Sequence, residues 1–140
     1  IQSSGKSGDN LYIFKSIDKY LEMPELKNFV TSFVQSCGVP ISQILVEPKA
    51  SGKSLVQLLR RETRYNVSEI KTNFVRYSKI ERARASSPFI EGGRVFLVKD
   101  NWNDAFLQQV STFPNAKHDE HIDVTSYAIE RNLINNFFVV

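Results

Sequence analysis

Three acidic residues and both histidines of the chain fall within the short stretch His118-Asp119-Glu120-His121-Ile122-Asp123. Carboxylate oxygens are the ligands that hard divalent cations prefer. In a helix, Asp119 lies about 60° and Asp123 about 100° from Ile122, so both carboxylates border an apolar face, whereas Glu120, about 160° away, points to solvent. The stretch could therefore form one wall of a metal site. An acidic first turn that complements the helix dipole is the more common reason for such spacing.

A further acid that could join this site, Glu47, follows the apolar run Ile44-Leu45-Val46. This run predicts a buried strand, and a loop and a leucine-rich helix follow it. Sites in open α/β sheets collect at the C-terminal ends of strands. A single acid at such an end is usually a surface residue or a helix cap. Together with Asp119 and Asp123, however, Glu47 would complete a cluster able to hold a divalent cation through oxygen ligands.

The two histidines could ligate zinc, but structural zinc sites commonly add cysteine ligands. The single cysteine, Cys37, falls on the apolar side of a predicted helix, where a buried structural thiol is expected. A helix-starting or metal-supporting role is therefore favoured for His118.

Basic residues interleaved with aromatic ones precede the acidic stretch: Lys71, Phe74, Arg76, Tyr77, Lys79, Arg82 and Arg84. As the solvated face of a helix such a tract is ordinary. Beside a metal site, the same tract would be placed to bind along the phosphate backbone of a nucleic acid. The predicted DNA contacts are Lys49, Lys79, Arg82 and Arg84.

A phosphate-binding loop for nucleotides is excluded. Gly52-Lys53-Ser54 follows a predicted strand, but the loop pattern requires a glycine five positions before Gly52, where this chain has Glu47. A carboxylate there would repel the phosphates. No strand is predicted before the same tripeptide at residues 5–7, so neither position binds a nucleotide.

Composition sets the class of protein. The chain has 140 residues, of which 41% are hydrophobic, and a net charge of +3. That length predicts one globular domain, and the charge permits a polyanionic partner. No apolar run approaches the ~20 residues that cross a bilayer, so a membrane partner is not expected.

The elements that position these residues alternate between strand and helix. Residues 1–9 are rich in serine and glycine and predict a flexible lead-in without a strand. The elements predicted after it are a strand over 11–21, a helix over 22–37, a strand over 43–47, a helix after 52, a weaker strand over 67–72, a basic helical or loop segment within 73–93, a strand over 94–99, a helix over 103–113, and a last helix running to about 133. This order predicts an α/β fold with helices packed on a central sheet.

Taken together, these residues resemble the C-terminal nuclease domain of large terminase subunits, the DNA-packaging motors of tailed bacteriophages. Three blocks carry the resemblance: Tyr12 to Leu26, the strand and loop over 44–52 with its helix, and the run from Lys79 to Asp123. The most specific motif is Phe-Pro-x-x-x-His-Asp-acid-x-x-Asp, which begins at Phe113. The resemblance covers roughly residues 9–132.

The resemblance implies an RNase H-like fold, with a central mixed sheet flanked by helices, and cleavage of duplex DNA with two Mg²⁺ or Mn²⁺ ions. By position, Glu47 matches the family's acid on the middle strand, and Asp119 and Asp123 match the acids of the final helix. Glu120 replaces a frequent aspartate, and His118 matches the histidine that opens the motif. The expected catalytic acids are thus Glu47, Asp119 and Asp123. The expected metal ligands are these three acids together with Glu120 and His118.

The chain departs from the family at its start. The family's first catalytic aspartate lies on a strand before the segment that matches residues 10–21, and this chain begins too late to contain that strand or its hairpin partner. Asp9 and Asp18 do not match it. We therefore expect a nuclease domain over residues 10–136 with truncated N-terminal strands, followed by a tail over 137–140. We expect this domain to bind one metal weakly and to cleave poorly.

The resemblance implies an endonuclease that cuts concatemeric duplex DNA in a viral packaging terminase. Its expected partners are double-stranded DNA, the portal protein and the small terminase subunit, in the cytoplasm of a bacterial host. The alternative is a non-catalytic DNA- or portal-binding module that keeps the fold without the first aspartate. Metal-independent, salt-sensitive DNA binding would favour this alternative.

Overall fold

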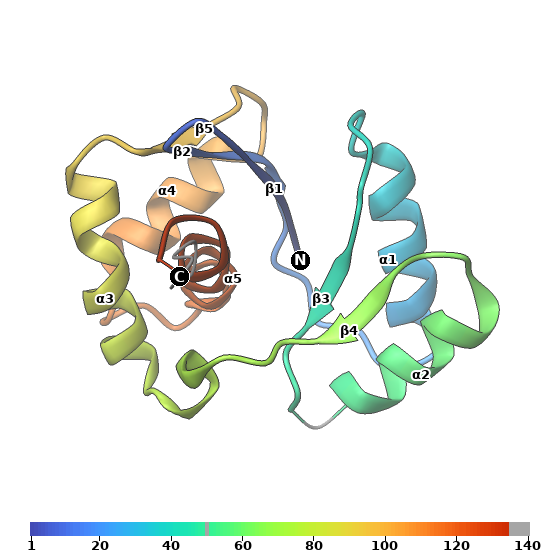
Figure 1. Ribbon diagram of the computed structural model, residues 1–140. Coiled ribbons are helices and arrows are strands. Elements are labelled where there is room, and N and C mark those ends of the chain that lie inside the picture. The colour runs from blue at the N-terminus through green and yellow to red at the C-terminus, as the bar shows by residue number, and fades with distance from the viewer. Residues whose placement is uncertain (50, 135–140) are drawn as a thin grey trace, which may run out of the picture. The chain divides into compact units, whose positions relative to one another are not determined.

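The computed structural model describes residues 1–49 and 51–134, and the predicted tail over 137–140 lies outside them. The chain forms two compact units, one built from residues 1–19 and 77–140 and the other from residues 20–76. Strands and helices alternate along the chain, which confirms the predicted α/β class (Figure 1). The single nuclease domain over 10–136 stays a prediction. Among the described residues, no helix is long and apolar enough to cross a membrane.

The first unit contains a three-stranded mixed sheet in the order β1-β2-β5. Strands β1 (Gln2–Ser7) and β2 (Asn10–Ser16) form an antiparallel hairpin, and β2 pairs in parallel with β5 (Val95–Leu97) (Figure 1). Gly8 makes the hairpin turn with a φ of 58°, a left-handed conformation that glycine adopts without steric cost.

The prediction that residues 1–9 lack a strand was wrong. Gln2 pairs with Ser16 and Ser7 with Asn10, which makes most of this segment a strand. Its sequence, Gln-Ser-Ser-Gly-Lys-Ser, contains no apolar residue and therefore no hydrophobic alternation. The hydrogen-bonding partner in β2, and not the side-chain pattern, selects the extended conformation.

The helices of the first unit are α3 (Lys79–Glu91), α4 (Asn103–Thr112) and α5 (Glu120–Ile129), which continues into the π-helical turn η2 (Glu130–Ile134). Helix α5 contacts α3, α4 and strands β1 and β2. Its predicted apolar stripe is confirmed, because Ile122, Ile129 and Leu133 are all buried. Leu11 of β2 packs in one core cluster with Ile129 and Leu133. This packing fixes which face of α5 remains accessible.

A capping box starts α3 at a defined residue. The Ser78 side chain accepts a hydrogen bond from the Glu81 backbone N–H, and the Glu81 carboxylate accepts one from the Ser78 backbone N–H. These bonds satisfy backbone donors that lack partners inside the helix. The cap therefore sets the helical phase of Lys79 and Arg82, which lie one turn apart on one face.

The second unit contains α1 (Glu25–Ser36), α2 (Gly52–Glu62), η1 (Asn73–Arg76) and a parallel pair of strands, β3 (Ile44–Val46) and β4 (Val67–Glu69). The predicted strand–loop–helix unit is confirmed. The described strands thus form two sheets, each within its own unit.

Gly52 is required by close packing at the start of α2. A Cβ atom at this position would lie 2.2 Å from the backbone oxygen of Glu47. The glycine thereby allows the helix start to approach the end of β3, where Glu47 lies.

Candidate metal and nucleic-acid site

Two carboxylates project from the start of α5. Asp119 occupies the N-cap position, and its backbone oxygen accepts a hydrogen bond from the Ile122 N–H at 3.0 Å. Asp123 follows one turn later on the same side. Both side chains are partly exposed, at 32% and 19%. As predicted, they border the apolar face.

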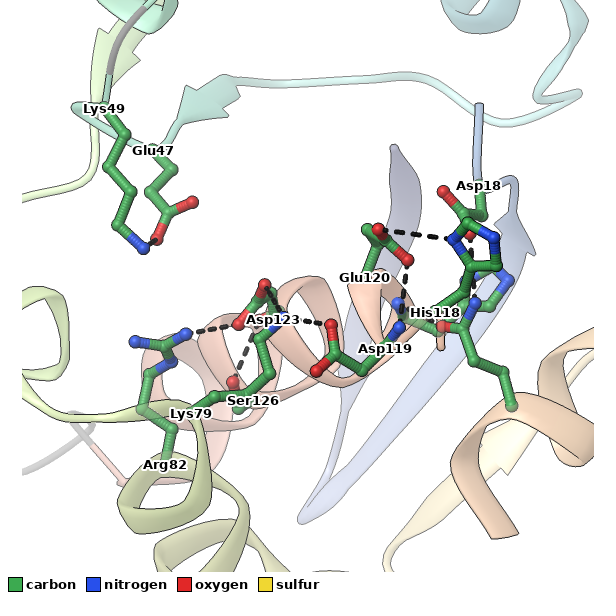
Figure 2. Close-up of polar contacts among 12 residues, drawn as sticks. Asp18, Glu47, Lys49, Lys79, Arg82, His118, Asp119, Glu120, Asp123 and Ser126 are labelled. Atoms are coloured by element: carbon green, nitrogen blue, oxygen red, sulfur yellow. Dashed lines mark hydrogen bonds and ion pairs between the residues drawn. The ribbon is translucent and has the colours of Figure 1, made fainter. Parts of the chain in front are cut away.

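Lys79 of α3 joins the two carboxylates. Its Nζ forms an ion pair with Asp119 Oδ1 and lies 2.8 Å from Asp123 Oδ2 (Figure 2). Burial opposes the charge of the ammonium group and by itself lowers its pKa. The hydrogen bonds and negative charges of the two aspartates outweigh this effect, so the pKa of Lys79 rises above its usual value. The two carboxylates thus share one cationic centre.

Arg82 of α3 holds the second oxygen of Asp123 from the buried side. Its Nη2 pairs with Asp123 Oδ1, its Nη1 donates to the backbone oxygen of Tyr77 at 2.8 Å, and its guanidinium lies 5.1 Å from the centre of the Tyr127 ring. The side chain is only 2% exposed. A buried charge needs such partners to offset the loss of hydration. Arg82 therefore forms part of the structural support of Asp123.

Glu120 and His118 lie together on the exposed side of the helix start. Glu120 Oε2 accepts a hydrogen bond from the Asp119 backbone N–H at 3.0 Å, and Glu120 Oε1 lies 3.7 Å from His118 Nδ1 (Figure 2). Glu120 is exposed, as its helical phase predicted. Their predicted roles as metal ligands stay predictions.

Asp18, which follows β2, completes an exposed group with His118 and Glu120. One ligand atom from each of the three side chains lies within 4.8 Å of the others. The sequence could not indicate this proximity, because Asp18 is distant in the chain and no local pattern links it to the acidic stretch. Exposed acidic groups of this kind are common without a metal.

His121 belongs to the core and not to the exposed acidic surface. Its Nδ1 shares a 2.8 Å hydrogen bond with Ser16 Oγ, and its ring packs against Phe106. Burial lowers the pKa of His121, and a nearby negative charge from Asp18 only partly opposes this shift. The Ser16 hydrogen bond and the Phe106 contact thus give the His121 ring a packing role in the core.

In the second unit, Glu47 lies directly after β3, as predicted. Its Oε1 forms a 2.9 Å ion pair with Lys49 Nζ, and its side chain is 28% exposed (Figure 2). A joint site of Glu47 with the two aspartates stays a prediction.

The predicted DNA contacts differ in accessibility. Arg84 on α3 is exposed, and the Lys49 side chain is 59% exposed. Lys79 and Arg82, in contrast, are engaged by the two aspartates. Arg84 is thus exposed, and Lys49 pairs with Glu47 although most of its side chain is exposed.

The donor set of Asp119 and Asp123 fits a hard divalent cation. The Lys79 ammonium stands in for such a cation, because both carboxylates direct an oxygen at the same positive centre. Ligands of this kind, consisting of carboxylate oxygens, suit Mg²⁺ and Mn²⁺.

A family model described as the terminase RNaseH-like domain matches residues 42–132. The chain belongs to this family. The match includes every residue predicted for catalysis, metal binding and DNA contact. It confirms the resemblance to the terminase nuclease domain and the RNase H-like fold. Searches of curated proteins and of solved structures found no match to the chain.

Proposed function

We propose that this terminase RNaseH-like domain is a metal-dependent endonuclease that cuts concatemeric duplex DNA during viral DNA packaging. The observation that carries the proposal is the convergence of Asp119 and Asp123 on one cationic centre, Lys79 Nζ, in a member of this family. Metal-dependent nucleases need acidic side chains that hold metal ions next to the scissile phosphate.

Asp119 and Asp123 would hold a divalent cation, with Glu120 and His118 in supporting positions. Glu47 is proposed as a further metal ligand because it matches the family's acid on the middle strand. When bound, such ions activate water and stabilise the leaving oxygen of a phosphodiester. The protein's own contribution begins with α5, whose packing against α3 orients the two aspartates. Arg82 then restrains Asp123 through a buried ion pair.

Duplex DNA is the proposed substrate. The exposed cations Arg84 and Lys49 support it, because Lys and Arg contacts to phosphates provide most of the sequence-independent affinity. In a packaging motor, the portal protein and the small terminase subunit are the proposed protein partners. The proposed place of action is the cytoplasm of a bacterial host.

The function can be tested by incubating supercoiled plasmid with the chain and either Mg²⁺ or Mn²⁺, and then separating nicked from intact plasmid on a gel. We expect nicking that a chelator stops and that Asp119→Asn and Asp123→Asn each reduce by at least about 100-fold, as expected for groups that hold catalytic metals. Asp104→Asn is the matched control, because Asp104 is an exposed acid on α4. Equal nicking by all variants would contradict the proposal.

A non-catalytic DNA- or portal-binding module is the second candidate. The ion pairs of Lys79 and Arg82 favour it, because they neutralise the aspartates without any metal. This candidate predicts salt-sensitive DNA binding that persists in a chelator, with no nicking in either metal. Nicking that depends on Asp119 would exclude it.

A further inference from the structure

The two cations that hold the aspartates differ in how firmly they are attached. Lys79 is 27% exposed, and its ammonium group contacts the two aspartates. Arg82 is 2% exposed and also contacts the Tyr77 backbone and the Tyr127 ring. One cation is thus near solvent and the other is part of the core.

This difference determines which cation can leave. An ammonium group is a compact charge on a flexible stem, and a partly exposed one regains water when it moves away. The guanidinium of Arg82 would have to give up its backbone acceptor and its aromatic partner as well, within a buried setting. Lys79 can therefore exchange with solvent ions, whereas Arg82 cannot without disturbing the core.

We propose that Lys79 is an internal counter-ion that occupies the aspartate pair without metal and is displaced when a divalent cation binds, while Arg82 remains and positions Asp123. This inference rests on the proposed function, because it requires Asp119 and Asp123 to bind the metal. It changes the interpretation of Lys79 from a permanent DNA contact to a group that competes with the metal. It also makes Arg82 a positioning residue.

The inference predicts opposite effects of removing the two charges. Lys79→Met removes the competitor and should tighten Mn²⁺ binding by about tenfold, because binding no longer requires release of the ammonium. Arg82→Met should weaken Mn²⁺ binding, because Asp123 loses its restraint. Simple removal of positive charge would tighten binding in both variants. The opposite signs therefore separate positioning from general electrostatics.

Calorimetric titration of Mn²⁺ into the full chain measures these affinities. Lys99→Met is the matched control, because Lys99 is an exposed lysine of the same unit and its loss changes the net charge equally. We expect the control to bind Mn²⁺ as the wild type does. Should Arg82→Met fail to fold, Arg82→Lys keeps the charge but lacks the planar fork, and it should still bind Mn²⁺ about threefold more weakly.

A second measurement follows Lys79 directly. In nuclear magnetic resonance spectra of ¹⁵N-labelled protein, the ammonium signal of an ion-paired lysine is retained because its protons exchange slowly. Addition of Mg²⁺ should shift or remove the Lys79 signal and leave that of Lys27, which pairs with Glu62 in the second unit, unchanged.

The outcomes distinguish the two proposals. If wild type and Lys79→Met both bind Mn²⁺ no better than Asp119→Asn, the metal site fails and the inference fails with it. If wild type binds Mn²⁺ but Lys79→Met binds no more tightly, only the counter-ion role is overturned. If Arg82→Lys binds as tightly as wild type, the positioning role of Arg82 is overturned.

Discussion

Arg82 of α3 and Asp123 of α5 form an ion pair in which the guanidinium is almost fully buried, at 2% exposure, and the carboxylate is 19% exposed. The pair joins the basic tract to the acidic stretch inside one compact unit. Arg82 therefore has a structural role that a solvated helix face would not provide. Because Asp123 is also a proposed metal ligand, the stability of this unit and the geometry of the site depend on the same contact.

Removal of the Arg82 guanidinium should destabilise the first unit. Arg82→Met leaves the Asp123 carboxylate without its buried partner, and we expect the free energy of unfolding to fall by about 2–4 kcal/mol. Urea unfolding followed by the fluorescence of Trp102, the single tryptophan, reports on this unit. Arg84→Met, which changes an exposed arginine of the same helix, should have an effect within about 0.5 kcal/mol. Equal losses in both variants would contradict the role of the buried pair.

Stability should decrease as the pH falls through the ordinary range of histidine. Burial lowers the pKa of His121 below 6.5, so the unfolded chain binds the proton more tightly than the folded chain does. The stabilising effect of neutral His121 is therefore complete above pH 6.5 and is lost as the pH drops toward the lowered pKa.

Urea midpoints of wild type and His121→Gln between about pH 5.5 and 7.5 test this dependence, since that range brackets the ordinary histidine pKa. The variant should show a flatter profile. His118→Gln changes the exposed histidine and should keep the wild-type profile. A profile that His121→Gln leaves unchanged would assign the pH dependence to other groups.

Packing between the hairpin and α5 should account for much of the first unit's stability. Leu11 of β2 is fully buried against Ile129, so Leu11→Ala should cost about 2–5 kcal/mol. Leu107 on α4 is 52% exposed, and Leu107→Ala should cost less than about 1 kcal/mol. The urea midpoint, again followed by Trp102 fluorescence, checks both values. Similar costs for the two leucines would argue against this core.

DNA affinity should depend on exposed Arg84 through its charge. If Arg84 contacts a phosphate, Arg84→Gln should make the negative slope of log affinity against log salt shallower by about 0.9. Fluorescence anisotropy of a labelled duplex at several salt concentrations measures this slope. Lys99→Gln removes an exposed charge after β5 and serves as the control, with an expected slope near that of wild type. An identical decrease in both variants would indicate a nonspecific charge effect.

Local features of the fold could be predicted from the sequence. Helical spacing predicted the buried apolar stripe of the last helix, which consists of Ile122, Ile129 and Leu133. The apolar run before Glu47 predicted strand β3. The phase of Asp119 and Asp123 at the rim of the apolar face could also be predicted. These features depend on the helical period and on short-range patterning, which are properties of a single segment.

The tertiary structure decided which segments meet. Strand β1 exists because β2 offers it hydrogen bonds, although its own residues show no strand pattern. Lys79 and Arg82 are basic residues on one helical turn, and only the packing of α3 against α5 made them partners of the aspartates. His121 resembled its neighbour His118 in the sequence, yet its ring is buried against Ser16. Long-range contacts of this kind depend on how the elements pack, which the period of one segment does not encode.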